Sequence, residues 1–199
     1  MISHFQTYTT EADAQAVAAV IATANLAAGH VVRSFERETA TFLGLADGVA
    51  VSSGTAGLHL ALLALDIGSG DEVVLPSYLC VAPLNAICHA GAVPVLADVD
   101  PDTGNLDPED VKKRLTGRTR AIIVPHLFGR PAPIAELQSL GVPIIEDLAQ
   151  AFGASLAGRP LGGYGNLAVC SFYATKVFTT GEGGMVLSRD RTLLGRVRD

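Results

Sequence analysis

The chain has 199 residues, of which 49% are hydrophobic, and its formal net charge is −6. This length suits one domain with a sizeable core. The basic residues are scattered, which argues against a nucleic-acid or anionic-membrane surface, and no apolar run reaches the length of a membrane span.

The first half of the chain alternates between helical and strand patterns. Glycines mark the ends of several apolar segments, and short continuous apolar runs lie between the helices. Helices are predicted over residues 11–26, 32–45, 55–65 and 81–90. Strands are predicted over residues 48–55, 71–76 and 92–99.

The second half continues this alternation. One helix has Asp107 as its cap and Pro108 in its first turn. Helices are predicted over residues 107–115, 132–141, 148–153 and 190–199, and strands over 120–129, 142–147, 166–172 and 183–188. Short apolar strands separated by helices predict an α/β fold, a three-layer sandwich with a mainly parallel sheet.

Ligands of such sheets bind beyond the carboxyl ends of the strands, so the residues that follow the strands matter most. Here they include a hydroxyl-rich glycine turn, His126, the acidic pair Glu146 and Asp147, and Lys176. The chain lacks paired metal-ligand spacings, the GxxxxGK[ST] motif of a P-loop and a GxGxxG turn after its first strand.

The stretch SSGTAG, residues 52–57, opens directly into a predicted helix. Free N–H groups at a helix start, together with the helix dipole, favour an anion, and the hydroxyls of Ser53 and Thr55 add donors. The stretch is either a phosphate cradle or an ordinary helix cap with a glycine hinge. Taken alone, the cap is the commoner arrangement.

The stretch IIEDLAQAFG, residues 144–153, ends a buried strand with an acidic pair. A buried acid needs a partner. Asp147 either caps the helix predicted to follow it or faces a protonated ring nitrogen of a cofactor. Gln150, one helical turn later, either donates to a ring substituent or lies on the helix surface.

The stretch SFYATKVFTTGEGGM, residues 171–185, contains one lysine, Lys176, and its nearest acidic residue is Glu182. Lys176 is either a surface lysine on a loop or an amine that forms a Schiff base with an aldehyde. An anion cradle, an acid and such a lysine, in this order along an α/β chain, are together the groups that bind pyridoxal 5'-phosphate.

From about residue 8 to its end, the chain resembles the DegT/StrS family of pyridoxal-phosphate-dependent sugar aminotransferases, which have the aspartate aminotransferase fold (fold type I). IIEDLAQAFGA and SFYATKVFTTGEGGM are the most specific stretches. The resemblance implies that Lys176 forms the Schiff base and that Asp147 pairs with the pyridine nitrogen. The cofactor-binding residues that it implies are Ser53, Gly54, Thr55, Ala56, Cys80, Asp147, Gln150, Ser171 and Lys176.

Three of these residues have more particular roles by the resemblance. Gln150 would lie near the ring hydroxyl of the cofactor, and Ser171 would help to hold its phosphate. Cys80 stands where many family members place an aromatic ring over the cofactor face. The resemblance therefore leaves open which residue covers that face, and Tyr78 lies close by in the sequence.

The activity implied by the resemblance is amino transfer from an amino acid, commonly glutamate, to a keto-sugar nucleotide or a keto-cyclitol. Lys176 would carry the proton between the amino carbon and the cofactor. A related branch of the family consists of dehydratases with histidine at the lysine position, and Lys176 disfavours that branch. Family active sites form between two subunits, so a homodimer is expected.

The resemblance also bears on domain organisation and location. Family chains are longer and continue into a smaller C-terminal domain, so residues 1–199 are expected to be the cofactor-binding large domain without its complement. Two alternatives are a non-catalytic fragment that binds cofactor or a partner, and a split enzyme completed by a second polypeptide. The N-terminal segment lacks signal-peptide features, and the three cysteines are expected to be free thiols in a reducing cytoplasm.

Overall fold

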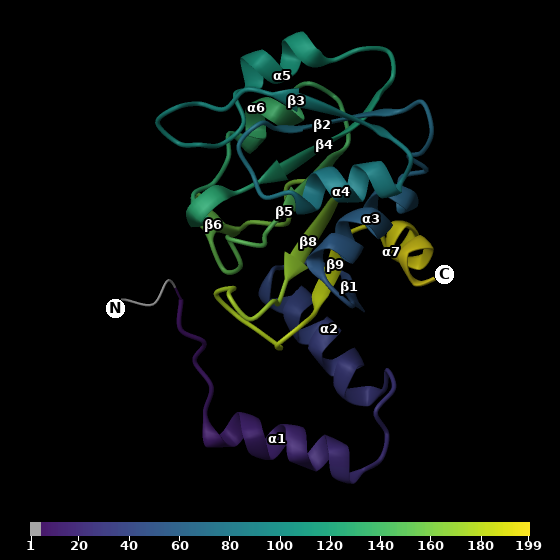
Figure 1. Cartoon of the computed structure of the whole chain (residues 1–199), viewed down its shortest axis with the longest axis vertical. Coiled ribbons are helices and arrows are strands. Elements are labelled where there is room, and N and C mark those ends of the chain that lie inside the picture. The colour runs from purple at the N-terminus through teal and green to yellow at the C-terminus, as the bar shows by residue number, and fades with distance from the viewer. Residues whose placement is uncertain (1–4) are drawn as a thin grey trace.

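The computed structural model describes residues 5–199, so the first four residues of the segment assessed for a signal peptide lie outside the described part. A seven-stranded sheet forms the centre of the molecule, and helices cover both of its faces (Figure 1). This arrangement confirms the predicted three-layer α/β fold.

The strands follow the order β1-β9-β8-β5-β4-β2-β3 across the sheet. Strands β3, β2, β4, β5 and β8 are paired in parallel, whereas β9 runs antiparallel to its neighbours β8 and β1. The sheet is therefore mainly parallel, as predicted. The strands are β1 (Asp47–Val51), β2 (Glu72–Pro76), β3 (Val93–Ala97), β4 (Thr119–Pro125), β5 (Ile144–Asp147), β8 (Leu167–Ser171) and β9 (Gly184–Ser188).

The helices divide between the two faces of the sheet. Buried apolar residues of α3, α4 and α7 form one core cluster with one face, and residues of α2, α5 and α6 pack on the other face in two further clusters. The helices are α1 (Glu11–Ala22), α2 (His30–Phe42), α3 (Gly54–Ala64), α4 (Ala82–His89), α5 (Pro108–Arg114), α6 (Ile134–Gln138) and α7 (Arg191–Arg198).

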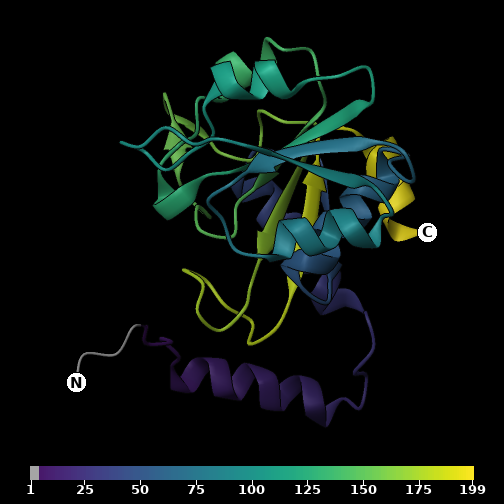
Figure 2. The same ribbon diagram turned by 45° about the horizontal axis from the view of Figure 1, so that its top comes forward.

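Helix α1 stands away from the body of the molecule in both ribbon views (Figures 1 and 2). It begins with a capping box between Thr10 and Asp13, and none of its residues is buried. Helix α7, in contrast, packs on the body of the molecule. Its residues Leu194 and Val197 are buried in the core cluster that includes residues of α3. The apolar side of the helix predicted over residues 190–199 is thus covered within this chain.

The structure corrects the prediction for the residues that follow Asp147. A helix was predicted over residues 148–153, but residues 149–153 form turns and Leu148 has no regular structure. The side chain of Asp147 accepts a hydrogen bond from the N–H of Ala149 at 2.9 Å, which closes a tight turn, and Gly153 adopts a φ of 83°. This local bond competes with the start of a helix.

Two other local features differ from the prediction. The strand predicted over residues 120–129 ends at Pro125, and a short 3₁₀ turn, η1 (Leu127–Gly129), follows it. A two-stranded hairpin of β6 (Ser155–Leu156) and β7 (Arg159–Pro160) has no counterpart in the sequence prediction. Within residues 5–199, no helix is both long enough and apolar enough to cross a membrane.

Candidate functional site

The candidate site lies where the carboxyl ends of β5 and β8 meet the start of α3. Asp147 ends β5, Ser171 ends β8, and Lys176 lies on the segment that joins β8 to β9. A cavity of about 230 Å³ opens between these elements. Its lining includes Ser53, Gly54, Thr55, Cys80, Asp147, Ser171 and Lys176. The fold therefore brings together seven of the predicted cofactor residues, while Ala56 and Gln150 lie outside this lining.

The start of α3 offers donors to an anion. Ser53 is the N-cap residue, and its hydroxyl accepts a hydrogen bond from the N–H of Ala56 at 3.1 Å. Within residues 5–199, no hydrogen bond is made by the N–H of Gly54 or of Thr55. Ser53 is thus an ordinary helix cap, as the alternative interpretation held. The two free N–H groups and the helix dipole still favour an anion at this end.

Glycines allow α3 to begin directly against the sheet. A Cβ atom at Gly54 would lie 2.7 Å from the Cβ of Ser171, and a Cβ atom at Gly184 would lie 2.5 Å from the carbonyl carbon of Ser53. Ser171 and Gly184 are paired in the sheet, so both contacts join the same three segments. The hydroxyl of Ser171 is thereby held beside the first turn of α3.

Asp147 is a buried carboxylate, with only 7% of its surface exposed. One oxygen, Oδ1, accepts the hydrogen bond from Ala149, and Oδ2 has no hydrogen-bond partner among the described residues. Burial raises the pKa of Asp147, although the Ala149 hydrogen bond and the nearby charge of Lys176 oppose that rise. A cation placed in the cavity would offset the cost of burying this charge.

Lys176 is half-buried and lines the same cavity as Asp147. Its ammonium group forms no hydrogen bond or ion pair with any residue in the described part of the chain. Its backbone N–H donates to the carbonyl of Tyr173 at 2.9 Å, within the segment that connects β8 and β9. The amine is therefore available for a ligand that occupies the cavity.

Gln150 lies in an adjoining cavity of about 50 Å³, which shares Cys80, Asp147 and Lys176 with the first. Its Oε1 accepts a hydrogen bond from the N–H of Phe128 at 2.9 Å. This bond leaves the amide nitrogen of Gln150 to donate to a ligand. Cys80 is exposed and lines both cavities, and all three cysteines, which lie within residues 5–199, are free.

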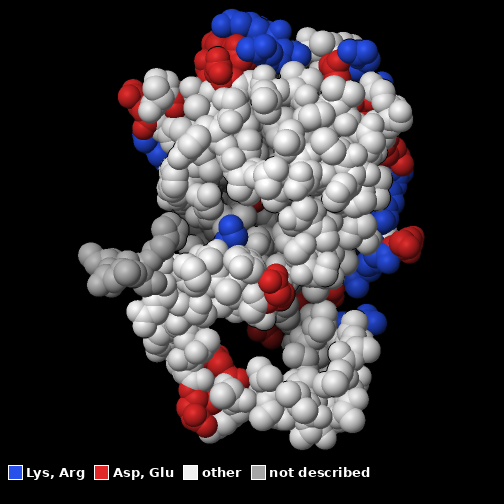
Figure 3. Space-filling view, in the orientation of Figure 1, with Lys and Arg blue, Asp and Glu red and all other residues white. Residues whose placement is uncertain are grey.

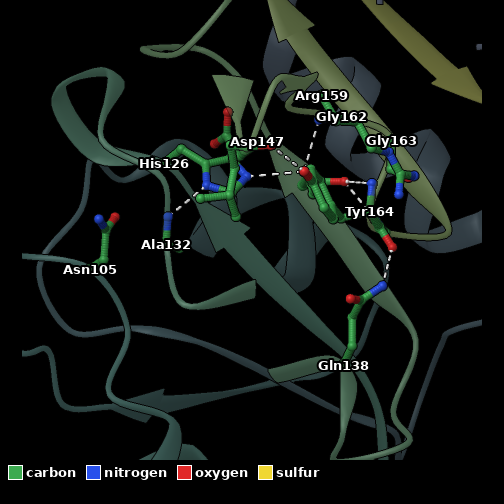
Figure 4. Close-up of polar contacts among 12 residues, drawn as sticks. Asn105, His126, Ala132, Gln138, Asp147, Arg159, Gly162, Gly163 and Tyr164 are labelled. Atoms are coloured by element: carbon green, nitrogen blue, oxygen red, sulfur yellow. Dashed lines mark hydrogen bonds and ion pairs between the residues drawn. The ribbon is translucent and has the colours of Figure 1, made fainter. Parts of the chain in front are cut away.

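A buried polar network next to Asp147 received no role in the sequence analysis (Figure 4). The carboxylate of Glu146 is fully buried, and it accepts hydrogen bonds from His126 Nε2 at 3.1 Å and from the N–H of Gly162 at 2.8 Å. His126 Nδ1 accepts the N–H of Ala132 at 2.9 Å, so the ring proton lies on Nε2. The one signal in the sequence is a charged pair at the end of an apolar strand.

Burial by itself would raise the pKa of Glu146, but the hydrogen bonds from His126, Gly165 and Gly162 outweigh it and hold this pKa below its ordinary value. Glu146 therefore stays ionised, although it is buried. Its bonds attach the carboxyl end of β5 to the segment after β4 and to the residues before β8. The backbone next to Asp147 is thus fixed by contacts with two other segments, the one after β4 and the one before β8.

The arrangement as a whole fits pyridoxal phosphate. The start of α3 presents donors to a phosphate, Oδ2 of the buried Asp147 has no hydrogen-bond donor among the described residues, and the unpaired amine of Lys176 lines the same cavity. On the molecular face in Figure 3, many charged groups lie near α5 at the top and near α7 at the side, and acidic groups lie near α1. Isolated basic and acidic groups lie near the middle, where no large patch of one sign is present.

Comparisons with known proteins agree with this geometry. The sequence model of the DegT/DnrJ/EryC1/StrS aminotransferase family matches residues 7–199. The GDP-perosamine synthase of Escherichia coli O157:H7 is 39% identical over 172 residues, which are 84% of this chain and 47% of that protein. The L-glutamine:2-deoxy-scyllo-inosose aminotransferase of Streptomyces kanamyceticus is 42% identical over 169 residues, 83% of this chain and 40% of that protein.

Solved structures show the same likeness. The aminotransferase TlmJ from Streptoalloteichus hindustanus superposes with a TM-score of 0.95 at 41% identity, and the match covers 100% of this chain and 56% of that one. The chain spans about half the length of the curated relatives it matches.

Proposed function

Because the chain belongs to the DegT/DnrJ/EryC1/StrS aminotransferase family, we propose that it binds pyridoxal phosphate and uses it to transfer an amino group. The acceptor is a keto-sugar nucleotide or a keto-cyclitol, and the donor is an amino acid, with glutamate as the first choice. The relatives support both acceptor classes, since one makes GDP-perosamine and another acts on 2-deoxy-scyllo-inosose.

One observation carries the proposal: the start of α3, Asp147 and Lys176 face one cavity. The N–H groups of Gly54 and Thr55 and the hydroxyl of Ser171 would hold the phosphate. Oδ2 of Asp147 would accept a hydrogen bond from the protonated ring nitrogen, and this cation would offset the cost of burying the carboxylate. The free amide nitrogen of Gln150 would donate to the ring hydroxyl.

When bound, pyridoxal phosphate supplies an aldehyde that condenses with amines and a protonated ring that withdraws electrons from the amino carbon. Lys176 would provide the amine that bonds to this aldehyde, with loss of one water, and its freed Nζ would carry a proton to and from the amino carbon of the substrate. Asp147 would keep the ring nitrogen protonated.

The organisation of the whole enzyme belongs to the same proposal. Residues 1–199 act as the cofactor-binding large domain, and a smaller domain completes the enzyme. We place it in the cytoplasm as a homodimer with one cofactor in each subunit. The alternative is a chain that binds the cofactor without turnover, or one that needs a second polypeptide for activity.

Trapping of the cofactor on its lysine tests the proposal. Protein incubated with pyridoxal phosphate and reduced with borohydride should carry the pyridoxyl group on the peptide that contains Lys176. Lys112 and Lys113 are exposed on α5 and serve as internal controls, because they should be labelled only at high reagent concentration. Labelling confined to α5, or equal at all three lysines, would contradict the proposal.

A further inference from the structure

The segment that carries Lys176, residues 172–183, contains no helix or strand. Hydrogen bonds within the segment shape it, since the N–H of Thr180 and the hydroxyl of Thr179 both donate to the carbonyl of Phe172, at 3.0 Å and 2.9 Å. Another bond, from the hydroxyl of Thr7 to the carbonyl of Ala174 at 3.0 Å, comes from the N-terminal segment. None of these bonds joins Lys176 to the turn that carries Asp147.

Aromatic rings make that connection. The ring of Phe178 stacks on the ring of Phe152, with centroids 5.6 Å apart and planes 25° apart. Phe152 stacks in turn on Phe42 at the end of α2, at 5.5 Å and 16°. We call Phe42, Phe152 and Phe178 the phenyl stack. The edge of the stack meets Phe172, whose centroid lies 5.4 Å from that of Phe178 with the planes 77° apart.

The phenyl stack joins the two segments that carry the groups proposed for the chemistry. Phe178 is two residues beyond Lys176, and Phe152 follows Asp147 and Gln150 in the same run of turns. Phe178 keeps 40% of its surface exposed, so its ring does not serve to fill the interior of the core. The neighbouring Val177 is 78% exposed and takes no part in the stack. Of the two apolar residues that directly follow Lys176, Phe178 therefore belongs to the stack and Val177 does not.

We infer that Phe178 is a positioning residue: its stacking on Phe152 holds the Lys176 segment at a set place relative to Asp147. The inference rests on the proposed function and deepens it. For a bond to form, the amine of Lys176 would have to reach the aldehyde carbon of the cofactor, while Asp147 would hold the cofactor ring. The two segments must therefore be aligned, and small errors in such alignment slow reactions strongly. Stacked rings add a directional contact that ordinary apolar packing lacks.

Hydrogen exchange of the cofactor-free protein tests the contact itself. In Phe178→Ala, amides of residues 173–182 should exchange faster, on the order of tenfold, while those of α3 and β5 keep the parental rate. Val177→Ala is the matched control, since it removes an apolar side chain from the same segment outside the stack. Phe178→Tyr keeps the ring and should restore slow exchange. Equal exchange in Phe178→Ala and Val177→Ala would overturn the inference.

A pair of ligands then tests positioning of the amine. Pyridoxal phosphate has the aldehyde, whereas pyridoxine phosphate has an alcohol in its place and depends only on the phosphate and ring contacts. Phe178→Ala should lose affinity for pyridoxal phosphate, on the order of tenfold, with unchanged affinity for pyridoxine phosphate. Phe152→Ala should show the same split, and the double variant should lose less than the two single losses combined.

The outcomes separate the inference from the function on which it rests. An equal loss for both ligands in Phe178→Ala, or no loss for either, would overturn the positioning role. If the parental protein binds the aldehyde no better than the alcohol, the bond from Lys176 and the proposed function fail, while hydrogen exchange still decides whether the stack orders the segment. Phe178→Leu, which keeps apolar volume without a ring, replaces Phe178→Ala if the latter does not fold.

Discussion

Asp147 and Glu146 are neighbours at the end of β5, and both are buried. Their surroundings nevertheless shift their pKa values in opposite directions. Glu146 is surrounded by donors, and its pKa is lowered. Burial raises the pKa of Asp147, since its hydrogen bond from Ala149 and the charges near it do not outweigh the desolvation. Glu146 therefore serves the structure in its ionised form, whereas Asp147 keeps an oxygen for a ligand.

The raised pKa of Asp147 predicts how stability should depend on pH. The protonated acid is favoured in the folded chain, so its contribution to stability is complete below the ordinary aspartate pKa of about 3.9 and is lost as pH rises through the raised value. In the cofactor-free protein, Asp147→Asn should therefore increase the free energy of unfolding at pH 7. The gain should shrink as the pH approaches 4.

Urea unfolding of both proteins at several pH values measures this difference. Glu182→Gln provides the control, because Glu182 is an exposed carboxylate at the rim of the same cavity and its loss should change stability little. A lower stability of Asp147→Asn at pH 7 would show that the carboxylate is already compensated within the chain, and the argument for a missing cation would fail.

At the scale of elements, the start of α3 reaches the cavity because β8 and β9 let it approach. Gly54 and Gly184 leave room where a side chain would collide with Ser171 or with the backbone at Ser53. Strand β9, which runs antiparallel to β8, brings Gly184 beside Ser171. The anion site thus depends on the packing of three elements, α3, β8 and β9. Its backbone donors, the N–H groups of Gly54 and Thr55, nevertheless come from one short stretch of sequence.

Gly54→Ala should disturb this junction. The new methyl group would lie 2.7 Å from the Cβ of Ser171, so α3 or β8 must shift. Forced overpacking of this kind costs about 1–3 kcal/mol, and the shift should also weaken binding of pyridoxine phosphate. Chemical unfolding and a binding titration measure the two effects.

Gly195→Ala in α7 is the matched control. A Cβ atom there would meet nothing within 4 Å, so the alanine should stabilise its helix by about 0.5–1 kcal/mol. Unchanged stability and phosphate affinity in Gly54→Ala would show that the approach of α3 to Ser171 is not as close as described.

At the scale of the whole molecule, the chain matches about half the length of its curated relatives. The residues proposed to hold the cofactor all lie within the described part. The proposed amino transfer also requires an acceptor to be placed against the cofactor, and placement of the second substrate supplies much of the rate of such a reaction. We therefore expect cofactor binding and turnover to be separable in this protein.

We predict that the 199-residue chain alone binds pyridoxal phosphate and transfers amino groups from glutamate slowly, by orders of magnitude compared with the completed enzyme. Addition of a polypeptide that corresponds to the second half of the relatives, in trans or as a fusion, should raise the rate. The amount of keto acid formed from glutamate in each mixture is the measurement. Full activity of the chain alone would contradict this prediction.

The alternation of apolar strands with helices was sufficient to predict a mainly parallel three-layer sheet, because buried parallel strands need continuous apolar runs and covering helices. The positions of Lys176 and Asp147 were also predicted from short stretches, since each follows a strand at the edge where ligands gather. Ser171 was named through the family resemblance, and the roles of all three residues are proposals. The turn after Asp147 was predicted wrongly as a helix, because a side-chain bond to Ala149 overrides the local pattern.

Contacts between distant segments were decided by tertiary structure alone. The approach of Gly54 to Ser171, the bonds from His126 and Gly162 to Glu146, and the stacking of Phe178 on Phe152 each join segments that only the strand order brings together. Periodicity reports which side chains one element buries, whereas the partners of those side chains depend on how the elements pack. The sequence by itself therefore determined the chemical groups of this protein, and the packing of its sheet determined which of them meet.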